Sequence, residues 1–406
     1  MSEIYFLLAI SLYLILAVLN KDYYHPGAML VLLWLLSSAL ASYEPLYNSD
    51  IQSPISFEAH ASILTAGMSL FLPAFIMSFS SKKINNDRLE SFYFSNKYAL
   101  FLDFFICLSI FAFIIRFGAI IFQPPILYFG FSDLKESVPS GIPVIHYFDL
   151  LTPFLAITVI HALLFSEGMN RFRVWYFRLF IVFSLTTIIF YKISRGELLI
   201  IILGWLYLIY YKYRFSLAKM LSVVVCIIIV FLLFTYLRLS TGGMVASYLG
   251  DGAASYISPI YTYVAINFEN FNKLTLSEGF NYTYYLSSLK FIIYPFYPEL
   301  YNSKYSDIKD FNTLFFNAKP FIYYFYHDLG LFGVALYSSL ISSLVSLFHL
   351  VSKRDVRYSL MLSFMQKAIF FLFFGNYFFG EMVIFFPYVF GMLAIIAMHK
   401  RVRVFN

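Results

Sequence analysis

The stretch YKISRGELLIIILGWLYL, residues 191–208, places a short polar hairpin directly before an apolar run. Ser194 and Glu197 match the Ser-x-x-Glu pattern of a capping box, which predicts that a helix begins here with Ser194 as its N-cap. Glu197 is then a capping residue rather than a catalytic acid. Residues 198–208 carry no charge, as is typical of a helix that crosses a membrane.

Apolar runs of this kind recur along the whole chain. Of its 406 residues 61% are hydrophobic and only 12% are charged, and the mean hydropathy is +0.77. A soluble domain carries about 25% charged residues. We therefore predict an all-α fold, a polytopic membrane helix bundle of about 11 transmembrane helices in a single integral membrane domain spanning residues 1–406.

The predicted spans are roughly 4–19, 26–43, 60–80, 98–117, 145–165, 175–193, 196–211, 217–237, 320–349, 359–378 and 381–398. The first lacks a basic leader and a small-residue cleavage site, so we expect a retained helix rather than a signal peptide. Residues 239–319, between spans 8 and 9, are polar. A connection of this length is usually functional.

Basic residues predict which side of the membrane each loop faces. Clusters follow every odd-numbered span and end the chain, and basic loops stay in the cytoplasm. The C-terminus is therefore predicted to be cytoplasmic, with the N-terminus and the loop 239–319 outside. The clusters are Lys82, Lys83 and Arg88; Arg171, Arg173 and Arg178; Lys212, Arg214 and Lys219; Lys353, Arg354 and Arg357; and Lys400, Arg401 and Arg403.

Three arginines oppose this bias because they fall at the predicted outer ends of spans. Arg116 closes span 4, Arg195 lies between spans 6 and 7, and Arg238 closes span 8. They could extend toward lipid headgroups, as arginines at helix ends often do. Guanidinium groups also bind phosphate with two hydrogen bonds, and a helix N-terminus favours a bound anion. Arg195 at the capped helix start thus predicts a pyrophosphate site.

His327 and Asp328 lie side by side where the long loop re-enters the membrane. Ionisable residues within a span are costly unless they have partners or a function. His327 is a candidate general base, because imidazole titrates near neutral pH. Asp328 is a second catalytic candidate, or ties the helix to a neighbour. Gly330 and Gly333 are expected to allow close helix packing.

The remaining acidic and metal-binding residue types form no recognisable pattern. The histidines and the two cysteines, Cys107 and Cys226, lack metal-ligand spacing, so no metal and no cofactor is predicted. Weaker site candidates, each of which could be a solvated charge, are Glu44, Asp50, Glu58, Asp251, Glu269 and Glu381.

Several of these stretches resemble one family, the Wzy-type oligosaccharide repeat-unit polymerases. Residues 191–197 are similar to its Ser-Arg-Gly hairpin, and 311–313 to its Asn/Thr-rich loop end. Residues 326–333 resemble its Tyr-x-Asp-Phe-Gly-x-x-Gly re-entry, with Leu329 in place of Phe, and 261–274 resemble the helical start of its large periplasmic loop.

The resemblance implies an O-antigen, capsule or exopolysaccharide polymerase in a bacterial inner membrane, with a periplasmic N-terminus. Such an enzyme joins oligosaccharide repeat units carried on undecaprenyl pyrophosphate, without a metal. A sugar hydroxyl of one unit attacks the anomeric carbon of another, and lipid pyrophosphate leaves. Membrane lipid and a polysaccharide chain-length regulator are its expected partners, and nucleic acid is not.

Two other functions fit the same features. An O-antigen ligase also transfers glycan from lipid pyrophosphate, and His327 at a re-entry helix suits that family. A lipid-linked sugar flippase would place charges near the bilayer midplane and often contains inverted repeats. The charges here gather at one predicted membrane face and no repeat is apparent, which favours the polymerase.

Cysteine labelling tests the predicted sidedness. In a background without Cys107 and Cys226, an impermeant maleimide should modify Asn281→Cys and spare Val404→Cys in intact spheroplasts. The reason is that the loop 239–319 is predicted outside and the basic C-terminus inside. Labelling of Val404→Cys alone would invert the topology and remove the basis for an external site.

Overall fold

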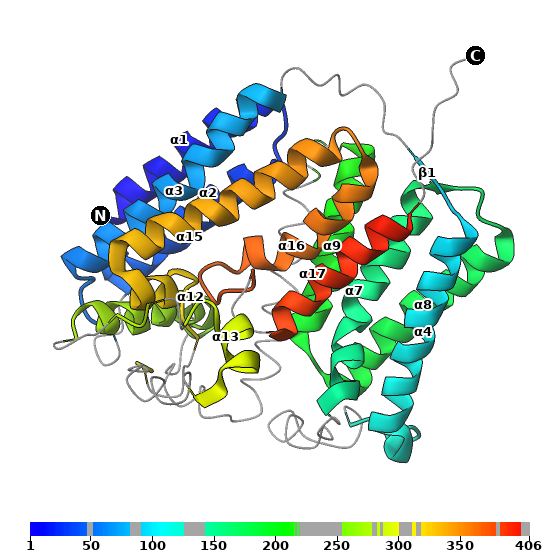
Figure 1. Ribbon diagram of the computed structural model, residues 1–406. Coiled ribbons are helices and arrows are strands. Elements are labelled where there is room, and N and C mark those ends of the chain that lie inside the picture. Colours follow the sequence, from blue (N-terminus) through cyan, green and yellow to red (C-terminus); the bar gives the residue numbers. More distant parts are fainter. Residues whose placement is uncertain are drawn as a thin grey trace. The chain divides into compact units, whose positions relative to one another are not determined.

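The computed structural model describes residues 1–46, 52–81, 91–125, 143–214, 216, 219, 254–277, 282–284, 287–299, 311–313, 318–378 and 382–398. Helices make up most of this part of the chain (Figure 1). Arg238, and all but one residue of the predicted span 217–237, lie outside the described residues.

Seven of the described helices are long and apolar enough to cross a membrane. They are Ser2–Asn20, Phe57–Ser80, Asn96–Ile120, Tyr147–Phe165, Arg171–Lys192, Arg195–Tyr213 and Ile322–Ser352, and two shorter apolar helices are Pro26–Ala41 and Ile384–Ala397. The prediction of an all-α, multi-pass membrane protein is confirmed at this level. The total of about 11 spans stays a prediction.

The chain forms two compact units. Unit 1 contains Met1–Asn85, Tyr256–Leu350 and Ala368–Phe385, and unit 2 contains Asn86–Ser255, Val351–Lys367 and Phe386–Asn406. Parts of the predicted external loop 239–319 are described, and they contain two helices, α12 (Ala254–Thr275) and α13 (Lys290–Phe296).

Unit 1 is organised around the indole of Trp34. Its other helices are α1 (Ser2–Asn20), α2 (Pro26–Ala41), α3 (Phe57–Ser81) and α15 (Ile322–Ser352), with a short 3₁₀ turn η1 (Glu44–Leu46). Trp34 on α2 is fully buried and donates from Nε1 to the carbonyl of Ile63 on α3 at 3.1 Å. Its ring meets Phe268 of α12 and Phe321 just before α15. One aromatic side chain therefore joins four segments of the unit.

Unit 2 is built around a central helix, α7 (Pro143–Phe165), which packs against α4 (Asn96–Phe117), α8 (Arg171–Thr186) and α9 (Arg195–Tyr213). A six-residue π-helix, η3 (Thr187–Lys192), continues α8. The other elements are the paired strands β1 (Phe92–Tyr93) and β2 (Ser166–Glu167), the 3₁₀ turns η2 (Gly118–Ile120) and η4 (Val356–Tyr358), most of α16 (Ser359–Phe370), and most of α17 (Met382–Ala397).

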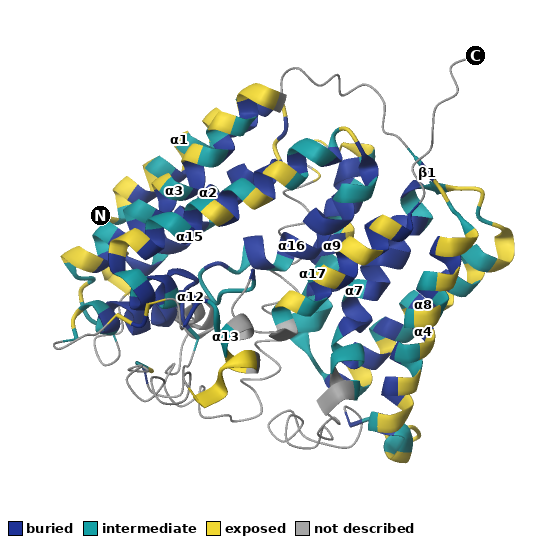
Figure 2. Cartoon of the chain, in the orientation of Figure 1, coloured by how far each residue is buried: buried dark blue, intermediate teal, exposed yellow. Residues whose placement is uncertain are grey.

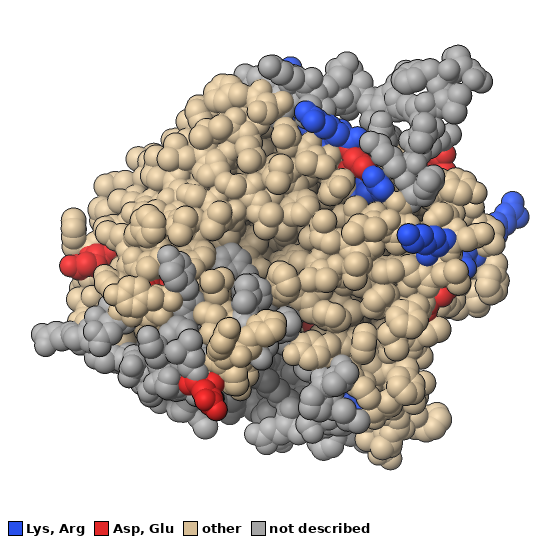
Figure 3. Space-filling view, in the orientation of Figure 1, with Lys and Arg blue, Asp and Glu red and all other residues tan. Residues whose placement is uncertain are grey.

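The exposed surface has the composition expected of lipid contact. Large apolar side chains stand exposed along helices such as α1, where Leu7 is 64% and Val18 69% exposed (Figure 2). Uncharged residues form most of the face in Figure 3. Such extended apolar exposure is unfavourable in water and normal in a bilayer.

Two predicted spans differ from the helices observed. The predicted span 359–378 contains a helix that ends at Phe370, because the chain leaves the helix to pair the carbonyl of Leu372 with the amide of Phe321 at 2.9 Å. The predicted span 320–349 contains α15, which is interrupted at Leu329 and Gly330. Neither difference could be predicted from hydropathy, because one depends on a contact between distant residues and the other on a glycine conformation.

Candidate functional site

The predicted site residues are divided between the two units. Arg116 and Arg195 belong to unit 2, whereas His327 and Asp328 belong to unit 1. Arg238 lies outside the described residues. The surroundings of each set of residues are therefore given by contacts within its own unit.

The start of α9 in unit 2 is capped as the sequence predicts. Ser194 has extended backbone angles, and its Oγ accepts a hydrogen bond from the amide of Glu197 at 3.3 Å. Ile193 takes a left-handed conformation that ends η3 and turns the chain. The reciprocal half of the capping box is replaced, because the amide of Ser194 donates to the carbonyl of Ile188. The carboxylate of Glu197 instead pairs with Lys192 at 2.9 Å.

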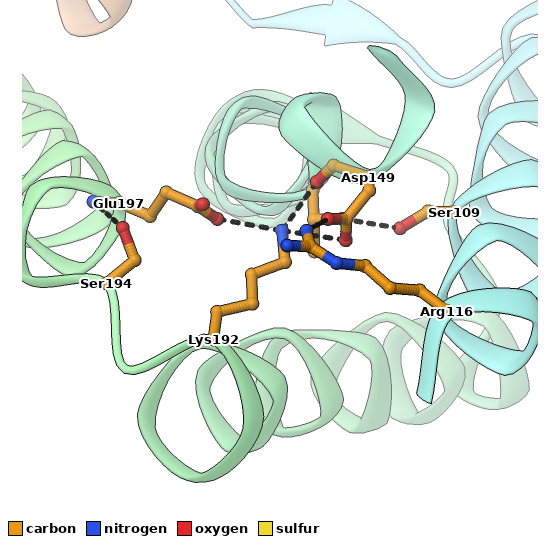
Figure 4. A network of polar contacts seen from close by, with 7 residues as sticks. Ser109, Arg116, Asp149, Lys192, Ser194 and Glu197 are labelled. Carbon is orange, nitrogen blue, oxygen red and sulfur yellow. Dashed lines mark hydrogen bonds and ion pairs between the residues drawn. The ribbon is translucent and has the colours of Figure 1, made fainter. Parts of the chain in front are cut away.

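A buried carboxylate, Asp149, is the centre of a charged network beside this turn (Figure 4). Its Oδ2 lies 2.5 Å from Nη1 of Arg116, and its Oδ1 lies 2.8 Å from Nζ of Lys192. The side chains of Asp149 and Lys192 are only 2% and 3% exposed. Beside them Ser109 of α4 and Thr152 of α7 share a hydrogen bond of 2.8 Å. The network links α4, α7, η3 and α9.

Lys192 makes two hydrogen bonds and an ion pair in this network. Its Nζ donates to the backbone carbonyl of Asp149 at 2.7 Å and to Oε2 of Glu197 at 2.9 Å, and it pairs electrostatically with the carboxylate of Asp149. Ions taken out of water in this way are stable only when they are well paired. Lys192 and Asp149 therefore hold the helix start in place.

A lysine of a later helix also approaches the first turn of α9. A Cβ added to Gly196 in the first turn of α9 would lie 3.2 Å from Nζ of Lys367 on α16. The cluster, counted within the described residues, thus has four cations and two carboxylates. The cations are Arg116, Lys192, Arg195 and Lys367, and the carboxylates are Asp149 and Glu197.

Sequence reasoning missed three members of this cluster, namely Asp149, Lys192 and Lys367. Each falls inside a predicted apolar span. Ionisable residues within a span are functional candidates by default, and that signal would have identified them. Arg116 was identified, and the structure shows it paired with Asp149. A phosphate-binding role for Arg116 stays a prediction.

In unit 1, Asp328 holds Thr283, Ser287 and Ser288 against the beginning of α15. Its carboxylate is fully buried and accepts from the hydroxyl of Thr283 at 2.5 Å and from the amides of Ser287 and Ser288 at 3.0 and 2.8 Å. All three partners donate. An Asn at position 328 would turn an N–H toward donors, so even this small change should disturb the segment. These bonds favour the anchoring role of Asp328, and a catalytic role stays a prediction.

His327 takes part in the same arrangement. It is 1% exposed, and its Nδ1 lies 3.1 Å from the hydroxyl of Thr283. The carbonyls of His327 and Asp328 accept from the amides of Thr283 and Tyr284, both at 3.2 Å. These backbone bonds satisfy carbonyls that the interruption of α15 would otherwise leave open. A role for His327 as general base stays a prediction.

Gly330 and Gly333 explain the interruption of α15. Gly330 has φ 60° and ψ −143°, a region that essentially only glycine adopts. A Cβ on Gly333 would lie 2.2 Å from the carbonyl oxygen of Phe325. Gly330 also lies close to another segment, because a Cβ on it would lie 2.9 Å from the hydroxyl oxygen of Tyr282. The close approach at Gly333 is to the part of α15 before the interruption, and a role of either glycine in packing between separate helices stays a prediction.

The polar face of α12 contacts other segments of unit 1. Glu269 is 5% exposed and accepts from the amide of Ser53 at 3.1 Å, so its prediction as a solvated charge is wrong. Asn270 accepts from the amide of Thr313 at 2.6 Å and donates to the carbonyl of Ala318 at 2.8 Å. By contrast, Glu44 and Glu58 are exposed as expected, and Asp50, Asp251 and Glu381 lie outside the described residues.

Lys319 is a further residue of unit 1 that sequence reasoning missed. It directly precedes α15, is 5% exposed, and places Nζ 4.8 Å from the ring centre of Tyr323. Burial lowers the pKa of the Lys319 ammonium to about 8. A lysine of this kind exchanges protons much closer to neutral pH than an ordinary one. Its position before the first buried turn of α15 would have been the sequence signal.

The two units differ in what they can do chemically. The unit 2 cluster combines buried, paired ions with an arginine and the N-terminal amides at the start of α9, groups of a kind that bind anions with several oxygen atoms. The unit 1 cluster contains proton-exchanging groups beside a tightly held loop segment. Within the described residues, no group of three or more His, Cys, Asp or Glu side chains is placed to hold a metal ion.

Removing the Asp149 carboxylate tests its importance for unit 2. Asp149→Asn should lower the free energy of unfolding by about 3–5 kcal/mol, because Arg116 and Lys192 would lose a buried counter-charge. Asp103→Asn is the matched control, since Asp103 pairs with Arg173 in a much more exposed position and should cost about 1 kcal/mol or less. Thermal unfolding in detergent measures both. Equal losses would contradict the central place of Asp149.

Neither protein-family models, nor curated proteins, nor solved structures yield a match to this chain.

Proposed function

We propose that the protein is a membrane glycosyltransferase of the Wzy-like class. It would polymerise oligosaccharide repeat units carried on undecaprenyl pyrophosphate at the periplasmic face of a bacterial inner membrane. The product would be an O-antigen, a capsule or an exopolysaccharide. The proposal combines the sequence resemblance with the charged cluster of unit 2 in a multi-pass helical protein.

The observation that carries the proposal is the position of Arg195 at the capped start of α9. Beside this turn Asp149 pairs with Arg116 and Lys192, and Glu197 pairs with Lys192, so the helix start is held in place. The amides of a helix N-terminus and a guanidinium group both favour a bound phosphate. A diphosphate esterified at both ends carries one negative charge on each phosphorus and several oxygen atoms that can accept from such donors.

The proposed reaction uses these cations on the leaving group. The oxygen of an acceptor sugar hydroxyl forms a bond to the anomeric carbon of the donor glycan. The bond from that carbon to the diphosphate oxygen breaks, and the electron pair leaves with undecaprenyl pyrophosphate. Positive groups fixed in advance lower the energy of the developing charge. The hydroxyl proton passes to a general base.

A second function, transport of a lipid-linked sugar, is favoured by one specific observation. Interrupted helices often form binding sites in transporters. Here α15 is interrupted at Leu329 and Gly330, and η3 is a π-helix at the end of α8. A transporter would move the lipid-linked unit without forming a glycosidic bond. An O-antigen ligase, the third candidate, would transfer the glycan to a lipid A core rather than to another repeat unit.

Arg195 is the most direct test of the polymerase proposal. Arg195→Ala should reduce polymer formation about 10²-fold or more, because one fixed cation on the leaving group is lost. Arg195→Lys should restore only part of the activity, since lysine cannot make the two-pronged contact. Polymer length is measured on gels from cells that lack the native gene, with protein level checked by blotting.

Arg178→Ala serves as the matched control. Arg178 is exposed on α8 at the predicted cytoplasmic side, so its loss removes an arginine without touching the cluster. Polymer from Arg178→Ala should be normal, and single repeat units should accumulate with Arg195→Ala. Normal polymer from Arg195→Ala would rule out the proposed role of this residue.

A further inference from the structure

The hydroxyl group of Thr283 is surrounded by polar atoms of unit 1. Its Oγ1 lies 2.5 Å from Oδ1 of Asp328, 3.1 Å from Nδ1 of His327 and 3.1 Å from Oγ of Ser287. The side chain is 6% exposed, so these contacts are shielded from water. A hydroxyl group has one proton to donate and two lone pairs that accept. Thr283 can therefore donate to only one of these three neighbours.

The proton of Thr283 is directed at Asp328. A carboxylate only accepts, and a separation of 2.5 Å lies in the range of a hydrogen bond from a hydroxyl group to a carboxylate. The other backbone acceptor near Thr283, the carbonyl of His327, is 3.4 Å away. The two lone pairs of Oγ1 are then left to accept from His327 and from the hydroxyl group of Ser287.

This assignment decides which ring nitrogen of His327 carries the proton. Nδ1 faces an oxygen atom whose own proton is already directed elsewhere, so Nδ1 must donate in order to form a hydrogen bond with it. A neutral imidazole has a proton on only one of its two nitrogens. The hydrogen bond of one nitrogen thus sets the state of the other. Nε2 carries the lone pair.

We propose that Thr283 is a positioning residue: Asp328 orients its hydroxyl group, which holds His327 in the form with a proton on Nδ1 and makes Nε2 the proton acceptor of unit 1. A hydroxyl group that gives its proton to Nε2 would convert the ring to an imidazolium with N–H on both nitrogens, and the bond from Nδ1 to Thr283 would be kept. A part for Nε2 in glycosidic bond formation rests on the proposed function, whereas the position of the proton does not.

NMR spectroscopy of the full-length protein in lipid vesicles tests this assignment. The ring ¹³C and ¹⁵N shifts distinguish the two neutral forms of histidine, and labelling histidine alone limits the spectrum to seven residues. His327→Gln identifies the signal of His327 by its absence. At about pH 8, above the ordinary imidazole pKa of about 6.5, the wild type should carry the proton of His327 on Nδ1. A neutral ring with its proton on Nε2 would overturn the inference.

Two substitutions of Thr283 separate its hydroxyl group from its shape. Thr283→Ser keeps the hydroxyl group and should keep the proton on Nδ1. Thr283→Val cannot accept a hydrogen bond, so the form with a proton on Nδ1 should lose its predominance. Thr313→Val is the matched control, because Thr313 is also buried in unit 1 and its hydroxyl group accepts from Nζ of Lys273 at 2.9 Å. It should leave His327 as in the wild type.

An unchanged proton position in Thr283→Val would overturn the inference. If that variant does not fold, the spectrum of the wild type decides alone. On the proposed function, Thr283→Val should lower polymer formation about 10²-fold or more and Thr283→Ser should retain most of it, because a positioned base contributes about 10² to 10⁴. A wild type with the proton on Nδ1 that forms no polymer would support the inference and contradict the polymerase. Polymer formation with the proton on Nε2 would do the reverse.

Discussion

The carboxylate of Asp149 fixes the geometry on which the candidate anion site depends. It lies between the guanidinium of Arg116 and the ammonium of Lys192. Lys192 also forms an ion pair with Glu197 in the first turn of α9. Four segments thus converge on a pair of ions that are almost fully buried (Figure 4). Because a buried ion is costly without its partner, this arrangement has little freedom to rearrange. The position of Arg195 follows from it.

A second buried carboxylate has a comparable role in unit 1. Asp328 accepts three hydrogen bonds and secures Thr283, Ser287 and Ser288 next to an interrupted helix. The interruption needs Gly330, and the close approach to the carbonyl of Phe325 needs Gly333. This gives a physical reason for the spacing of Asp328, Gly330 and Gly333 in the re-entry stretch. An aspartate that holds a loop in this way positions its neighbours whether or not it takes part in chemistry.

Features that depend on neighbouring residues could be predicted from the sequence, and features that depend on distant ones could not. The cap at Ser194 was predictable because it joins residues three positions apart. Helices long enough to span a membrane were predictable from hydropathy. The partners of Arg116 and Lys192 lie 33 and 43 positions away, and nothing local marks Asp149 as their partner. The early end of α16 likewise depends on a backbone hydrogen bond that the amide of Phe321 donates to the carbonyl of Leu372.

Reconstituted activity tests the central claim most directly. The purified full-length chain would be placed in vesicles with an undecaprenyl-pyrophosphate-linked oligosaccharide as its sole sugar substrate. The account predicts glycans of more than one repeat unit, together with one free undecaprenyl pyrophosphate for each linkage formed. Unchanged donor that has moved to the opposite leaflet, with no new linkage and no released undecaprenyl pyrophosphate, would contradict it and identify a transporter.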